Sequence, residues 1–111
     1  MAETRTVRER AAEIGAKVNV ELERVVIAAE AVAKLPGQDF LCDAAVGDAM
    51  RAAASAQDHV ESLQRLRVMQ PPSDPARDIA ERHYSIARDR ANRAACLAVQ
   101  AWAKAQGART T

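Results

Sequence analysis

The chain has 111 residues, which is the length of a single domain. Its 16 basic side chains nearly balance 15 acidic ones, whereas proteins that bind nucleic acid through charge carry a marked basic excess. Apolar residues make up 49% of the sequence, but no run approaches the roughly 18 apolar residues of a membrane span. Neither a nucleic acid nor a membrane is therefore expected as a partner.

Much of the apolar fraction is alanine, and Phe40, Tyr84 and Trp102 are the only aromatic residues. Alanine buries little area, so a domain of this composition has a thin core and commonly needs a second copy or another protein to cover its helices. We therefore expect a homo-oligomer, dimeric or higher, that also has a protein partner.

The cellular setting is read from three features of composition. Arginine and alanine, which have GC-rich codons, outnumber lysine, as in a GC-rich bacterium or its phage. The charged start of the chain has no apolar stretch of a signal peptide. The two cysteines, Cys42 and Cys96, are then expected to be reduced thiols of a cytoplasmic protein, each buried as a small apolar side chain.

The first helix is predicted over about 6–35. Thr6 and Glu9 fit a capping box, in which each side chain bonds to the backbone amide of the other residue. Apolar residues then recur at steps of mostly three and four, the period of a helix face. They are Val7, Ala11, Ile14, Val18, Val25, Ala28, Val32 and Leu35. Pro36 and Gly37 end this helix.

The second helix is predicted over about 39–70, with Asp39 as its N-cap. Its apolar seam alternates steps of four and three, the spacing of a coiled coil. The seam consists of Cys42, Val46, Ala49, Ala53, Ala56, Val60 and Leu63. Gly47 lies inside this helix and is expected to mark a kink or a close crossing.

The third helix is predicted over about 75–107. Asp74 caps it and Pro75 occupies the first turn, where a missing amide costs nothing. Gly107 is expected to end it. Its seam consists of Ala80, Tyr84, Ala87, Ala91, Ala94, Ala98, Ala101 and Ala105, with Ile79, Ile86 and Leu97 in a flanking row.

These elements predict an all-α fold of three long antiparallel helices, because short connections make sequential helices neighbours. The fold is either an elongated up-down-up bundle or a helical hairpin that oligomerises, with the remaining helix docked on a second subunit. We expect one domain over 1–111, with 1–4 and 108–111 frayed. The residues predicted for the core or interface are Val18, Val25, Val32, Phe40, Val46, Ala53, Val60, Leu63, Tyr84, Ile86, Leu97 and Trp102.

A hairpin that turns near 72–73 has consequences for side-chain placement. It brings Phe40 beside Trp102, and we expect the two rings to form a core plug capped by Leu35. It separates Cys42 from Cys96 by about 12 Å along the helices, so no disulfide is expected.

The opposite end of the bundle gathers arginines and is the best candidate for an anion or nucleotide site. The candidate ligands are Arg8, Arg67, Arg77 and Arg82. Acidic residues share this region, so the alternative is an end neutralised by ion pairs.

Arg77 and His83 are separated as in an R-x(4–6)-H motif. This heptapeptide resembles the motif of the HEPN ribonucleases, a helical family. The resemblance implies that Arg77 and His83 would cleave RNA at a dimer interface. The alternative is that His83 is a half-buried residue on a helix flank.

Other chemistry finds no support in the sequence. No Glu-x-x-His pair of a di-metal bundle, no glycine-rich phosphate loop and no nucleophile beside a base is present. We therefore expect no metal, no cofactor and no enzymatic activity. The favoured hypothesis is a helical interaction protein that self-associates and binds another protein, as an adaptor or inhibitor. Its contact residues would be isolated apolar flanks, exemplified by Val20, Ile27, Met50, Leu66 and Val99.

Overall fold

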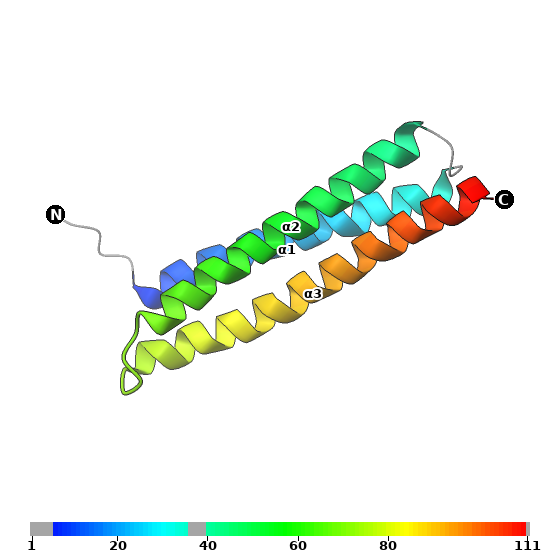
Figure 1. Ribbon diagram of the computed structural model, residues 1–111. Coiled ribbons are helices and arrows are strands. Elements are labelled where there is room, and N and C mark those ends of the chain that lie inside the picture. The colour runs from blue at the N-terminus through cyan, green and yellow to red at the C-terminus, as the bar shows by residue number, and fades with distance from the viewer. Residues whose placement is uncertain (1–5, 36–39, 111) are drawn as a thin grey trace.

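The structure is a computed structural model that describes residues 6–35 and 40–110. It contains the three helices α1 (Val7–Lys34), α2 (Phe40–Val68) and α3 (Pro75–Thr110). They lie side by side in antiparallel order, with the α2–α3 turn at the end where α1 begins (Figure 1). Every helix packs against both others. The all-α, up-down-up bundle is therefore confirmed, and α1 packs within its own chain.

Two of the predicted helix starts are confirmed in atomic detail. Thr6 Oγ1 accepts a hydrogen bond from the Glu9 amide at 3.1 Å, and the Glu9 carboxylate accepts one from the Thr6 amide at 3.4 Å. Asp74 Oδ1 accepts a hydrogen bond from the Ala76 amide at 2.9 Å. The third predicted cap, Asp39, lies outside the described residues.

The predicted end of α3 at Gly107 is wrong, because the helix continues to Thr110. A glycine ends a helix when it turns into the left-handed region. No glycine in the described part of the chain has a positive φ. A helical glycine costs only about 1 kcal/mol relative to alanine, which the continuing helix can absorb.

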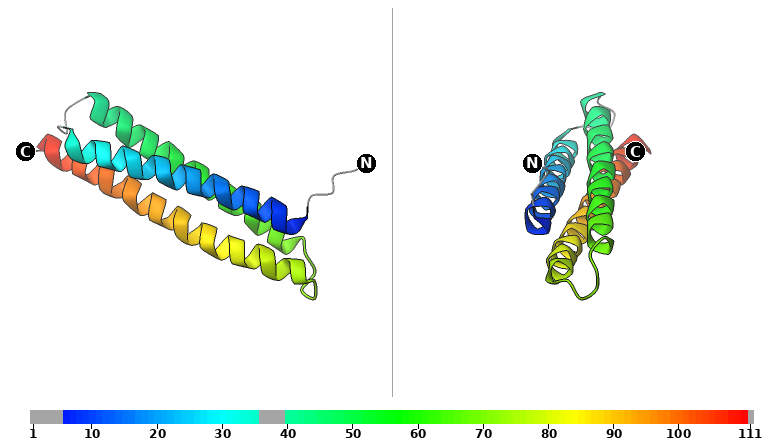
Figure 2. Two further views of the ribbon diagram at one scale, coloured as in Figure 1. Left: turned by 180° about the vertical axis from the view of Figure 1, so that it is seen from behind. Right: turned by 90° about the vertical axis from the view of Figure 1, so that its left-hand side faces the viewer.

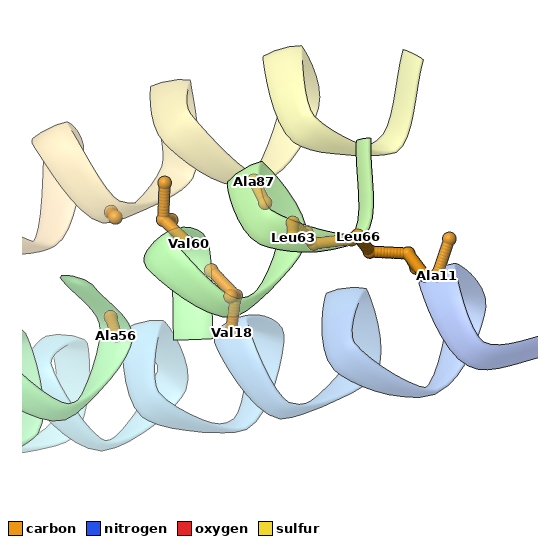
Figure 3. Close-up of a cluster of buried hydrophobic side chains, with 8 residues drawn as sticks. Ala11, Val18, Ala56, Val60, Leu63, Leu66 and Ala87 are labelled. Atoms are coloured by element: carbon orange, nitrogen blue, oxygen red, sulfur yellow. The ribbon is translucent and has the colours of Figure 1, made fainter. Parts of the chain in front are cut away.

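The core is a line of three clusters along the bundle axis. Figure 3 shows the one nearest the α2–α3 turn, where Ala11 of α1 lies beside Leu66 of α2 and Val18 lies beside Val60. Leu63 of α2 and Ala87 of α3 belong to the same cluster. The next cluster is centred on Val25 and consists otherwise of alanines of all three helices. Because α3 contributes only alanines to the buried core, the three helices can approach closely, and the core is as thin as the composition predicts.

Most of the predicted core residues lie inside the bundle. Those buried are Val18, Val25, Val32, Ala53, Val60 and Leu63. Val46, Tyr84 and Leu97 are half-buried and pack against the clusters. The apolar period of the sequence therefore identified the inner face of each helix correctly.

The predicted aromatic plug is wrong, because Phe40 is 80% exposed and Trp102 is 49% exposed. The cause is helical phase. Phe40 precedes the buried Cys42 by two residues, a rotation of about 200°, which turns it to the far side of α2. Trp102 directly follows the buried Ala101 and is rotated by about 100° from the core. Ile86, which directly precedes the buried Ala87, is exposed for the same reason.

Two further burial predictions are wrong. Cys42 is buried as expected, but Cys96 is exposed, and both are free thiols. Cys96 lies midway between Ala94 and Ala98, which both face the core, so it faces outward. Leu66 was expected on the surface but is buried, because it follows Leu63 by three residues and shares its face.

Polar contacts at mid-length tie α1 to both neighbours. Arg24 donates hydrogen bonds to Asp48 of α2 at 2.7 Å and to Glu21 at 2.9 Å. The hydrogen bond to Asp48, with the charge of Glu21, raises the pKa of the Arg24 guanidinium. On the other side, Arg90 of α3 donates to Asn19 at 2.7 Å.

The three helices run together along one long axis in both views of Figure 2.

Candidate functional site

The arginine-rich end of the bundle is already occupied by side chains of the chain itself. Both carboxylate oxygens of Glu81 accept hydrogen bonds from Arg67 Nη1, at 2.8 and 3.1 Å. The Arg67 guanidinium also lies over the Tyr84 ring, 4.7 Å from its centroid, and Arg88 contacts the same ring at 5.6 Å. An anion would therefore have to displace Glu81 to reach Arg67.

The other predicted anion ligands do not converge with Arg67. Arg77 is directed to the α2–α3 turn, where its Nη1 donates to the Gln70 carbonyl at 2.9 Å. Arg8 and Arg82 are exposed on α1 and α3. The four candidate arginines thus form no shared anion cradle within one chain.

The two residues of the R-x(4–6)-H motif are directed to different places. Arg77 binds the turn, whereas His83 lies over α1, with its Nδ1 3.6 Å from the position that a Cβ on Gly15 would occupy. A separation of six residues is a rotation of about 240°, so the two side chains leave α3 in different directions. His83 is half-buried on a helix flank, and the pair does not meet within one chain.

A shallow groove of about 220 Å³ separates α1 from α3. It exists because α1 presents Ala12, Gly15 and Ala16 to α3. His83 and Ile86 line its other wall, and the Asn19–Arg90 hydrogen bond crosses one end of it. Three of the residues that line this groove are polar, namely Asn19, His83 and Arg90, and Arg90 already donates a hydrogen bond to Asn19.

The described ranges contain neither a metal-binding cluster nor a membrane-spanning helix. No group of three or more His, Cys, Asp or Glu side chains there is placed to hold a metal ion. No helix of that part of the chain is both long and apolar enough to cross a membrane.

An apolar hollow with a volume of about 230 Å³ lies between α2 and α3. Its floor is made of the buried Ala53 and Ala98. Its rims are Met50 on α2 and Val99 on α3, which are 46% and 55% exposed. Alanine side chains keep the floor low while the larger rim residues stand above it, which produces a groove that can receive a ridge of another helix.

This groove is the centre of a longer pattern on each helix. Exposed and half-exposed residues recur along α2 at steps of three and four, and along α3 at steps of four and three, beside the buried seams. We call these two rows the flanking seams. On α2 the row is Gly47, Met50, Ala54, Gln57 and Glu61, and on α3 it is Arg88, Asn92, Ala95, Val99 and Trp102.

The flanking seams have the spacing with which helices pack in coiled coils, and helices commonly carry a second such row where they contact a fourth helix. Within the described chain no helix covers them, and Trp102 is left half-exposed. The α2–α3 face, defined as the two flanking seams and the groove between them, is therefore the candidate interaction site.

Sequence reasoning found only part of this face. It identified Met50 and Val99 as exposed apolar residues, but it assigned Trp102 to the core and gave Gly47 no partner. The missing signal was the regular spacing from Arg88 through Ala95 to Trp102, parallel to the buried seam.

Comparison with known proteins gives no further guide to function: no protein-family model matches the sequence, and no curated protein or solved structure is significantly similar to it.

Proposed function

We propose that this chain is a non-enzymatic interaction protein that self-associates and binds another protein by helix-on-helix packing. The supporting observation is the α2–α3 face. Met50, Val99 and Trp102 stand exposed around a floor of alanines, and such a combination of large rims and small floor suits an amphipathic helix laid into a groove. The composition favours a cytoplasmic adaptor or inhibitor of bacterial or phage origin.

The physical argument rests on the hydrophobic effect. Exposed apolar side chains at helical spacing cost solvation free energy that burial under a partner helix recovers, at about 25 cal/mol per Å². The groove is apolar over its central part, so a partner would need no buried charge to match it. The anion-binding alternative is less favoured because Glu81 already binds Arg67.

The test is capture of target proteins from the source cell by the tagged chain, followed by affinity measurement with the purified target. We expect Val99→Asp to weaken binding at least about tenfold, because it places a charge in the apolar contact. Ile27→Asp is the matched control, since Ile27 is 62% exposed on α1, away from the groove. Loss of binding with Ile27→Asp but not with Val99→Asp would contradict the assignment of the groove.

A further inference from the structure

The two flanking seams match each other level by level. Met50 and Val99 line the same hollow between α2 and α3, and we therefore take these two residues as level. Since the helices are antiparallel, each step along α2 corresponds to an equal step back along α3. Five level pairs follow: Gly47 with Trp102, Met50 with Val99, Ala54 with Ala95, Gln57 with Asn92, and Glu61 with Arg88.

The members of every pair are complementary in kind. Glycine lies level with the largest side chain, and only the flexible guanidinium of Arg51 lies beside Gly47, so an indole ring that moved this guanidinium aside would fit there. Two apolar pairs follow, then a pair of amides that can exchange hydrogen bonds, and last an acid with a base. In the described chain no hydrogen bond or ion pair joins Glu61 to Arg88; the nearest acid to Arg88 is Asp89 at 3.9 Å.

We propose that a second copy of this chain covers the α2–α3 face, related by a two-fold axis parallel to the helices. This inference rests on the proposed function and names the occupant of its groove when no target protein is bound; a target helix would compete with the second copy for the same face. Such an axis keeps every residue at its own level and sets α2 of one copy against α3 of the other. All five level pairs then form twice between the copies, in a four-helix arrangement of α2, α3 and their counterparts.

Charge selects this axis over the alternative. A two-fold axis that crosses the helices at Ala54 would set α2 against α2 and place Glu61 over Gly47 of the second copy. Glu61 would then meet Arg51 of the second copy, whose guanidinium lies beside Gly47, but Arg88 would lie over Trp102, where α3 carries no acid. The parallel axis instead gives each Glu61 the Arg88 of the second copy, and opposite charges at a contact favour one register over others.

The size of the face is sufficient for a dimer. An α2 of 29 residues is about 44 Å long. Two helices packed side by side present a face about 20 Å wide, so each copy offers on the order of 800 Å², the area per partner of a standard interface.

The test reverses one charge in each of two separate preparations of the full chain. Alone, Glu61→Arg sets two bases against each other across both contacts, and Arg88→Glu sets two acids. We expect each variant to raise the dimer dissociation constant about tenfold in sedimentation velocity. Mixing the two variants should restore wild-type affinity as a heterodimer, because both pairs are again opposite in sign. Only pairing between copies can produce this rescue.

Glu23→Arg is the matched control, since Glu23 is exposed on α1, and it should leave the dissociation constant unchanged. Circular dichroism checks that each variant keeps its helices. A wild-type chain that stays monomeric at 100-fold the concentrations used for capture, or a mixture that shows no rescue, overturns the proposal. A monomeric chain whose Val99→Asp variant still loses its target overturns the dimer while the interaction function stands.

Discussion

At the scale of single residues, the stability of this chain depends on very few large side chains. Leu63 and Leu66 are the largest fully buried ones, and most other buried positions are alanines. A core built this way has little apolar area to spare, because alanine contributes a single methyl group. Each buried leucine therefore carries an unusually large share of the folding free energy.

We expect Leu63→Ala to lower the free energy of unfolding by about 3 kcal/mol, through the lost apolar area and the cavity left among neighbouring helices. Urea denaturation followed by circular dichroism measures the change. Leu41→Ala is the matched control, because Leu41 is 59% exposed on the same helix, and a change within about 0.5 kcal/mol is expected. Equal losses from both variants would contradict the assignment of the core.

At the scale of helices, the buried seams and helix starts were predictable, since they depend on local rules. Thr6 with Glu9 and Asp74 with Pro75 identify helix starts because their side chains and rings act on the adjacent turn. The period of Val18, Val25 and Val32 identifies the inner face. The end of α3 was not predictable from Gly107, because a glycine permits a left-handed turn without requiring one.

The candidate site was harder to predict, because each helix has two parallel rows of residues at helical spacing, and only one of them is buried in the core. Ala101 and Trp102 are adjacent, and a rule that places large residues inside selects Trp102. Close packing of three helices selects Ala101 instead, since an indole would force the helices apart. The distance between the helices therefore decides which of the two residues is buried, and this distance cannot be derived from the residue spacing of a single helix.

Replacing Gly47 by alanine should stabilise the monomer but weaken the dimer. Its φ is an ordinary helical one, and a Cβ there would meet only the flexible guanidinium of Arg51, at 3.3 Å. Gly47→Ala should therefore raise the free energy of unfolding of the monomer by up to about 1 kcal/mol. In the proposed dimer the added methyl group would crowd Trp102 of the second copy and weaken association about tenfold.

Thermal unfolding at low protein concentration and sedimentation velocity measure these two effects separately. Gly107→Ala is the matched control, because a Cβ there would meet nothing within 4 Å. It should leave association unchanged. A Gly47→Ala variant that associates as strongly as wild type would argue against the contact between Gly47 and Trp102.

At the scale of the whole molecule, folding and association should be linked. A second copy that binds only the folded chain stabilises it by mass action, so the melting temperature rises with protein concentration. For a domain of about 100 residues, each kcal/mol of added stability raises the melting temperature by roughly 4–8 °C. A hundredfold increase in concentration above the dissociation constant adds a few kcal/mol per dimer, so the shift should be several degrees.

Differential scanning calorimetry over this hundredfold range of protein concentration distinguishes a dimer from a bundle that is stable as a monomer. Wild type should show the shift, Glu61→Arg should show little of it, and an equimolar mixture of Glu61→Arg and Arg88→Glu should recover it. All three samples keep Leu63, Leu66 and the buried alanines, so their intrinsic cores are identical. A difference in concentration dependence between them can then arise only from the α2–α3 face, and a melting temperature independent of concentration in wild type would show that the thin core suffices without a second copy.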